Sequence, residues 1–139
     1  MKTEFEKLER AIEELRDDPR PKLVEGRKDK EALSYFGVSN IKMVHGNALR
    51  EIPLKVHQDV ILLMDFDRSG RVMTRKLHDL FKSEGYSADL SFRRELRKLA
   101  RLNVIEELVS KYDELKNSDM RIRDSARKNR RIKTLKKEE

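Results

Sequence analysis

Two aspartates, Asp65 and Asp67, follow the apolar segment at residues 60–64 and stand just before Gly70. Side chains alternate along a strand, so a strand extending through this pair would point both carboxylates the same way, with their backbones roughly 6 to 7 Å apart. Carboxylate oxygens placed in this way suit a hard cation such as Mg²⁺. The spacing also fits a structural role, in which Asp67 caps the next helix and Asp65 makes a hydrogen bond. The pair alone leaves both interpretations open.

A third acid, Glu25, follows another short apolar segment and stands directly before Gly26. In an open parallel sheet, the ligand crevice lies outside the carboxyl ends of the strands. Glu25, Asp65 and Asp67 therefore meet in one crevice if their two strands are neighbours. Gly26, which has no side chain, lets a phosphate or a metal approach the backbone closely.

The elements that must position these acids alternate along the chain. Apolar spacings of three and four predict helices over residues 3–15, 28–36, 70–84, 92–101 and 104–115, and a short helix interrupted by Pro53. Continuous apolar runs predict strands at residues 22–25, 41–44, 59–64 and 86–90. Alternation of this kind predicts an α/β protein with a mostly parallel four-stranded sheet flanked by helices. We expect an N-terminal amphipathic helix at residues 1–18, one domain at residues 19–117, and a basic tail at residues 118–139.

The composition is unusually ionic, with 42% charged and 37% hydrophobic residues, against about 25% and 45–50% in ordinary globular domains. Such a surface fits either ion-pair networks or a nucleic-acid binder. The chain has no cysteine, which excludes disulfides and thiolate metal sites. The sequence has no apolar run approaching the roughly 18 residues of a membrane span, so we expect a cytoplasmic location.

The positive charge is concentrated in two places. Residues 118–139 carry nine basic and four acidic residues, which leaves 24 basic and 22 acidic residues in the rest of the chain. This tail has no convincing amphipathic stripe, so by itself we expect it to be disordered or a fraying helix that phosphate contacts order. A plain solubilising tail is the alternative. The basic residues of the tail include Arg121, Arg123, Arg127, Lys128, Arg130 and Arg131.

The second concentration is a stripe on the helix at residues 92–101, in which only Glu95 interrupts five cations. A solvated helix usually mixes the two signs of charge, so the stripe indicates contact with a phosphate backbone. A merely exposed helix face is the competing interpretation. The stripe consists of Arg93, Arg94, Arg97, Lys98 and Arg101.

The two acidic motifs resemble those of the Toprim domain found in primases, topoisomerases and small nucleases. The segments that carry the resemblance read Val-Glu-Gly-Arg-Lys-Asp at residues 24–29 and Asp-Phe-Asp-Arg-Ser-Gly-Arg at residues 65–71. The match is closest to the small stand-alone archaeal Toprim proteins, relatives of the nuclease that matures 5S ribosomal RNA, and covers roughly residues 20–117. One departure is the first strand, which is shorter and more polar than is usual in that family.

The resemblance implies a Rossmann-like Toprim fold and Mg²⁺-dependent cleavage of RNA phosphodiesters. Asp65 and Asp67 would hold the metal, Glu25 would be a further ligand or the general acid or base, and Arg68 or Arg71 would steady phosphate oxygens. A non-catalytic RNA-binding protein on the ribosome, with the Toprim fold as a scaffold, is the alternative. Primase or topoisomerase activity is disfavoured, because the chain is too short for the accessory modules.

The three histidines show no metal-like pairing. We expect surface or packing roles for His57 and His78. His45 follows the second predicted strand and is placed to border the crevice.

Overall fold

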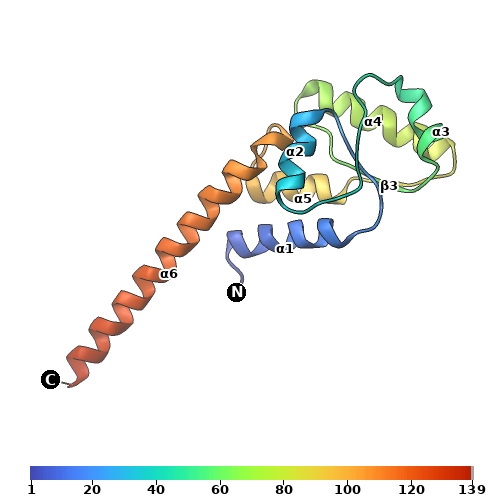
Figure 1. Cartoon of the computed structure of the whole chain (residues 1–139). Coiled ribbons are helices and arrows are strands. Elements are labelled where there is room, and N and C mark those ends of the chain that lie inside the picture. Colours follow the sequence, from blue (N-terminus) through green and yellow to red (C-terminus); the bar gives the residue numbers. More distant parts are fainter. Residues whose placement is uncertain (139) are drawn as a thin grey trace.

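The computed structural model describes the backbone of residues 1–138 and the side chains of residues 1–131. The last eight side chains of the predicted tail lie outside this description. Short strands alternate with helices along the chain (Figure 1). In order, the elements are α1 (Glu4–Asp17), β1 (Lys22–Val24), α2 (Arg27–Tyr35), β2 (Ile41–Met43), the 3₁₀ turn η1 (Leu49–Glu51), α3 (Ile52–Val56), β3 (Val60–Leu62), α4 (Arg68–Ser83), β4 (Ala88–Asp89), α5 (Ser91–Ala100), the 3₁₀ turn η2 (Ile105–Glu107) and α6 (Leu108–Glu138). None of the helices described is both long and apolar enough to span a bilayer.

The sheet has four strands in the order β2-β1-β3-β4, and all of the pairings are parallel. The predicted α/β class with a parallel sheet and an N-terminal helix is therefore confirmed. β1 and β3 are direct neighbours, with Leu23 opposite Leu62. This pairing meets the condition under which Glu25, Asp65 and Asp67 share one edge of the sheet.

Alternation along the two central strands builds two apolar layers. Val24, Ile61 and Leu63 face the layer made with α1, α2, α5 and α6. Leu23 and Leu62 face the opposite layer, made with α3 and α4. Because both faces of the sheet are covered, the central strands read as continuous apolar runs and not as alternating ones.

The polar start of β1 is accommodated inside the fold. Lys22 is buried, and its ammonium group donates a hydrogen bond to the carbonyl oxygen of Asp18. Arg20 lies beside it and pairs with both Asp18 and Asp89, each at 2.8 Å. Hydrogen bonding to Arg20 keeps the pKa of Asp18 below its ordinary value. The first strand is short because proline flanks it, and charged residues at its start are paired.

Two elements differ from their predicted extent. Regular pairing in β3 ends at Leu62, so Asp65 and Asp67 lie in the loop that leads into α4, not on the strand itself. The final helix was expected to end near residue 115, yet α6 continues to Glu138 after the 3₁₀ turn η2. The expected boundary at residues 117 and 118 therefore falls within one continuous helix, and the tail expected to be disordered or fraying is helical.

Docking on α1 supports the first half of α6. Tyr112 stacks edge-on against Phe5, with ring centroids 5.1 Å apart, and against Phe36 at 5.0 Å. One turn beyond the predicted boundary, Arg123 pairs with Asp119 at 3.1 Å and also with Glu6 of α1. These contacts hold the helix past residue 117, and its far end then extends away from the rest of the protein (Figure 1).

Candidate active site

An open hollow of about 370 Å³ lies at the carboxyl ends of β1 and β3. Two of the predicted acids, Glu25 and Asp65, line it, and Asp67 lies two residues further along the same loop. His45 also lines the hollow, as its position after β2 predicted. We call this hollow the acidic crevice. Its lining consists of Glu25, Gly26, Arg27, Lys28, Asp29, His45, Asp65, Val104 and Glu106.

Backbone N–H groups fix one oxygen of each predicted acid. Glu25 Oε1 accepts a hydrogen bond from the N–H of Asp65 at 3.2 Å, which joins the ends of β1 and β3 directly. Asp65 Oδ1 accepts from the N–H of Ile105 at 2.8 Å. Asp67 Oδ1 accepts from the N–H of Gly70 at 2.7 Å and so caps α4. The structural interpretation of the aspartate pair is thus geometrically correct, while Glu25 and Asp65 still line one crevice.

Gly70 allows the loop carrying the aspartates to lie against the start of α4. A Cβ atom on Gly70 would lie 2.0 Å from the carbonyl oxygen of Asp65 and 2.5 Å from its carbonyl carbon. Such an approach is possible only without a side chain. Thr74, one turn later, is buried and donates to the carbonyl oxygen of Gly70 at 2.7 Å. The glycine of the Asp-Phe-Asp-Arg-Ser-Gly motif therefore sets the position of Asp65.

The carboxylates of the crevice repel one another in a partly desolvated place. Burial, then the charge of Asp65, raises the pKa of Glu25. Burial, followed by the charge of Asp65, raises the pKa of Asp29 to about 6. Burial also raises the pKa of Asp65, although its hydrogen bond from Ile105 acts in the opposite direction. A bound cation would relieve this repulsion, since it favours the ionised form of every carboxylate near it.

The donor chemistry of the crevice fits a hard divalent cation. Glu25, Asp65 and Asp67 offer oxygen atoms only, which Mg²⁺ prefers, and Mg²⁺ keeps several of its waters. No three carboxylate or imidazole side chains within the described part of the chain are grouped closely enough to hold a metal ion as they stand. Binding would therefore require the side chains of these acids to turn toward a common point.

Two further acids of the crevice, Asp29 and Glu106, were not predicted as site residues. Asp29 is buried, and its Oδ2 accepts from the N–H of Gly26 at 3.2 Å, which places it in the first turn of α2. Its place in the Glu-Gly-Arg-Lys-Asp segment was the available signal. Glu106 belongs to η2, forty residues beyond the aspartate pair, and no local pattern in the sequence connects it with the crevice.

Arg93, the first member of the predicted basic stripe, is engaged inside the protein. Its Nε donates to the carbonyl oxygen of Met64 at 2.9 Å, and its Nη2 donates to that of Asp65 at 2.6 Å. The guanidinium also lies over the ring of Phe66, 4.7 Å from the centroid. Arg93 therefore binds the loop that carries Asp65 and Asp67.

The other four residues of the stripe are exposed and line a separate hollow of about 460 Å³. We call it the basic hollow. Arg97 also lies over the ring of Phe66, with its guanidinium 5.5 Å from the ring centroid. The basic hollow is lined by Arg94, Arg97, Lys98, Arg101, Leu102 and Asn103.

The remaining predicted RNA-binding residues lie on two helices. Arg68 and Arg71 are exposed in the first turn of α4, next to Asp67. On α6, Arg123 is held in the ion pairs with Asp119 and Glu6. Arg123 is exposed as well, as are the other basic residues of the α6 set, Arg121, Arg127, Lys128, Arg130 and Arg131.

The other two histidines lie away from the crevice. His78 lies 3.4 Å from Asp79, and the ring of His57 lies 6.4 Å from that of Tyr86.

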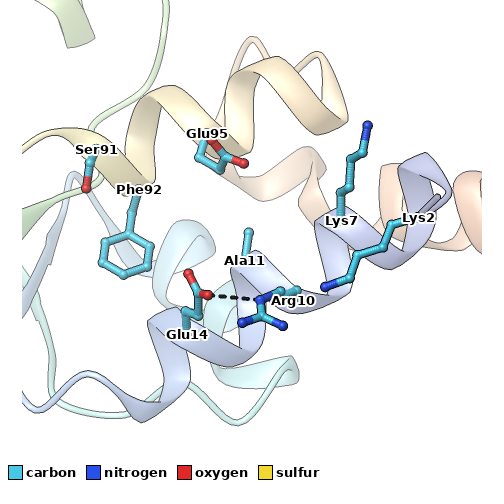
Figure 2. Close-up of a pocket in the computed structure, with 8 residues that line it drawn as sticks. All are labelled: Lys2, Lys7, Arg10, Ala11, Glu14, Ser91, Phe92 and Glu95. Atoms are coloured by element: carbon cyan, nitrogen blue, oxygen red, sulfur yellow. Dashed lines mark hydrogen bonds and ion pairs between the residues drawn. The ribbon is translucent and has the colours of Figure 1, made fainter.

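A further hollow, between α1 and α5, is lined by both basic and acidic side chains (Figure 2). The ring of Phe92 points from α5 toward α1, and Arg10 pairs with Glu14 at 3.2 Å. This hollow shares no residue with the acidic crevice.

Known proteins similar to this chain come mainly from archaea. A UPF0292 protein of Thermococcus sibiricus is 34% identical over 113 residues, which cover 78% of this chain and 90% of the relative. A UPF0292 protein of Pyrococcus furiosus is 32% identical, and the match covers 81% of this chain and 88% of the relative. A UPF0292 protein of Methanocaldococcus jannaschii is 33% identical, and the match covers 66% of this chain and 77% of the relative. A solved structure of a protein from Aquifex aeolicus is 33% identical, with a TM-score of 0.66 over 70% of this chain and 94% of the other. No protein-family model matches the sequence. The chain belongs to the UPF0292 family.

Proposed function

We propose that this protein is a Toprim-type RNA-binding protein that cleaves RNA phosphodiesters with Mg²⁺ at the acidic crevice. The observation that carries the proposal is the convergence of Glu25 and Asp65 on neighbouring strand ends, joined by the hydrogen bond from the N–H of Asp65 to Glu25 Oε1. The repulsion among these carboxylates suits a site that gains stability from a cation. The resemblance of the two motifs to Toprim sequences supplies the reaction type.

In this proposal, Asp65 and Asp67 would hold Mg²⁺, which as a Lewis acid would stabilise charge that develops on the phosphate. Glu25 would be either a further metal ligand or the general acid or base, and for the second role burial and the charge of Asp65 raise its pKa in the metal-free site. Arg68 and Arg71, in the first turn of α4, steady the phosphate oxygens. Arg93 positions the aspartate loop through the carbonyl oxygens of Met64 and Asp65.

RNA is the proposed substrate because basic residues are concentrated on α5 and on the second half of α6. The exposed arginines of α5 and the basic second half of α6 provide phosphate contacts without any need for base recognition. The proposal extends to ribosomal RNA or the ribosome as the partner, as the resemblance to the 5S-maturing nucleases implies.

A non-catalytic ribosome-associated RNA-binding protein is the second candidate. One observation favours it. Asp67 caps α4, and Asp65 accepts a hydrogen bond from the N–H of Ile105, so both aspartates have structural roles that need no metal. In this case the acidic crevice maintains the fold, and α5 and α6 provide the function.

The test is to incubate purified protein with labelled ribosomal RNA and Mg²⁺ and to compare the wild type with Asp65→Asn, Asp67→Asn and Glu25→Gln. Asparagine retains an oxygen that can accept the same N–H, and it caps helices about as well as aspartate. These variants therefore remove the negative charge and retain the fold. The matched control is Glu84→Gln, at the exposed far end of α4.

We expect Mg²⁺-dependent cleavage by the wild type and by the control, and a reduction of at least about 100-fold in each crevice variant. If the wild type and all of the variants bind RNA tightly but none of them cleaves it, the nuclease proposal is refuted and the non-catalytic RNA-binding protein is favoured. Cleavage that persists in all three crevice variants would show that a contaminating nuclease or another site is responsible.

A further inference from the structure

We propose that the basic hollow is a phosphate subsite that holds the RNA strand beside the acidic crevice. This inference rests on the proposed function, because it assigns the anion as a backbone phosphate of the same RNA. Four cationic side chains line the hollow, and no acidic side chain does. The ligand must therefore be an anion, and a concave site with several cations suits a phosphate group.

The four cations are not neutralised by the protein. Arg94, Arg97, Lys98 and Arg101 have no acidic partner within ion-pair distance among the side chains described. By comparison, Arg10, Arg27 and Lys55 are each paired with a glutamate one helical turn away, whereas these four cations lie together around one hollow. Clustering like charges costs free energy unless a counter-charge arrives.

The neighbouring hollow between α1 and α5 shows the contrast (Figure 2). It is also lined by three basic side chains, but Glu14 and Glu95 lie among them, and the dashed line in the figure marks the pair between Arg10 and Glu14. α5 thus borders one hollow in which two acids offset most of the basic charge and another in which no acid does. The hollow without acids has the stronger attraction for phosphate.

The basic hollow is directly connected to the acidic crevice through the segment after α5. Leu102 and Asn103 line the basic hollow, whereas the next residue, Val104, lines the acidic crevice. The carbonyl oxygen of Asn103 accepts the N–H of Phe66 at 2.9 Å, which ties this segment to the residue between the two aspartates. A strand whose phosphate lies in the basic hollow can therefore cross this segment and enter the crevice.

The hollow is also partly preorganised. Arg97 lies over the ring of Phe66, 5.5 Å from its centroid, and Phe66, which stands between the two aspartates in the sequence, is only 4% exposed. A guanidinium held against an aromatic face loses less conformational freedom when it binds. Phe66 therefore links the position of a phosphate-binding arginine with the position of the metal-binding aspartates.

The test measures the binding of a labelled single-stranded RNA of 12 nucleotides by fluorescence anisotropy in EDTA, over a range of salt concentrations. The test protein carries Arg94→Gln, Lys98→Gln and Arg101→Gln, and leaves Arg97 in place because of its contact with Phe66. The matched control loses the same charge at exposed positions outside both hollows, with Lys42→Gln, Arg75→Gln and Lys82→Gln. The single variant Lys98→Gln is a milder second test of the hollow.

We expect the triple variant to bind at least roughly tenfold more weakly and to give a salt slope shallower by about 2, since each phosphate contact on a single strand contributes about 0.7. The control should change the slope by less than about 0.7, and Lys98→Gln should fall between the two. Equal losses in the triple variant and the control, or no loss in either, would overturn the subsite.

The outcome is independent of the cleavage reaction, because EDTA removes Mg²⁺ from the assay. A wild type that binds through the basic hollow but never cleaves RNA leaves the subsite standing and refutes the nuclease. If cleavage needs the crevice acids but the triple variant keeps the salt slope of the wild type, the nuclease is supported and the phosphate subsite is refuted.

Discussion

Asp29 is the residue at which burial and charge conflict most directly. It is 7% exposed, and burial together with the charge of Asp65 raises its pKa to about 6. The sequence predicted Glu25, Asp65 and Asp67 because each follows an apolar strand. It did not predict Asp29 or Glu106, since their approach to the crevice depends on how α2 and η2 pack beside the sheet, and local patterns carry no such information.

The raised pKa of Asp29 predicts a pH-dependent stability of the metal-free protein. The folded state holds the proton more tightly than the unfolded chain, whose aspartate has a pKa of about 3.9, so ionisation above pH 6 destabilises the fold. A shift of two units corresponds to at most about 3 kcal/mol. We expect Asp29→Asn to be more stable than the wild type at pH 7.5 in EDTA, and this advantage to shrink as the pH falls from 6 to 4.

Urea unfolding at several pH values measures this difference. Asparagine can still accept the N–H of Gly26, so the start of α2 is retained. Asp79→Asn, at an exposed position on α4, serves as the control. A gain from Asp29→Asn that is the same at pH 4.5 and pH 7.5 would contradict the prediction.

The loop between β3 and α4 determines where the aspartates lie. The sequence predicted a strand at residues 59–64 with the two aspartates delivered at its end, because the apolar run leads into the pair without a break. The structure ends the strand at Leu62, since the loop must bend to lay the carbonyl of Asp65 against Gly70 and to let Asp67 cap α4. The elements themselves were predictable from periodicity, whereas this bend depends on a contact between backbones.

Gly70→Ala should destabilise the protein although the position is helical. In most helix interiors, replacing glycine by alanine stabilises the helix by up to about 1 kcal/mol. In this case the new Cβ would lie 2.0 Å from the carbonyl oxygen of Asp65, and overpacking of this kind costs about 1 to 3 kcal/mol. Chemical unfolding should therefore show a loss of stability.

Gly26→Ala is the matched control for this prediction. A Cβ on Gly26 meets no atom within 4 Å, and the backbone φ of −152° is open to any residue. We expect its stability to remain within about 0.5 kcal/mol of the wild type. If Gly70→Ala were as stable as Gly26→Ala, the close approach at Gly70 would not constrain the loop.

At the scale of the whole molecule, the dominant feature is the length of α6. The chain has no amphipathic stripe beyond residue 115, because the contacts that hold this part of the helix are ionic. Asp119 is buried and pairs with Arg123, which also pairs with Glu6 on α1. Contacts of this type between distant charged residues leave no hydrophobic periodicity to detect.

Truncation at two positions separates docking from RNA binding. A chain ending after Asp124 keeps the contacts of Arg123 and should unfold at the same temperature as the full chain, while its RNA affinity falls and its salt dependence flattens. A chain ending after Asn117 also loses the pairs with Glu6 and Asp119 and should be less stable by about 1 kcal/mol. Calorimetry and anisotropy measure the two effects. Equal stability losses for both truncations would contradict this assignment.

The docking of α6 also fixes a direction. A helix of 31 residues is about 46 Å long, so it acts as a lever arm whose pivot lies near Tyr112 and Arg123. Because about 22 Å of helix extends beyond Arg123, a tilt of about 10° there moves the far end by roughly 4 Å. The edge-on ring contacts and the Glu6–Arg123 pair therefore determine the direction in which the most basic segment of the chain extends from the domain.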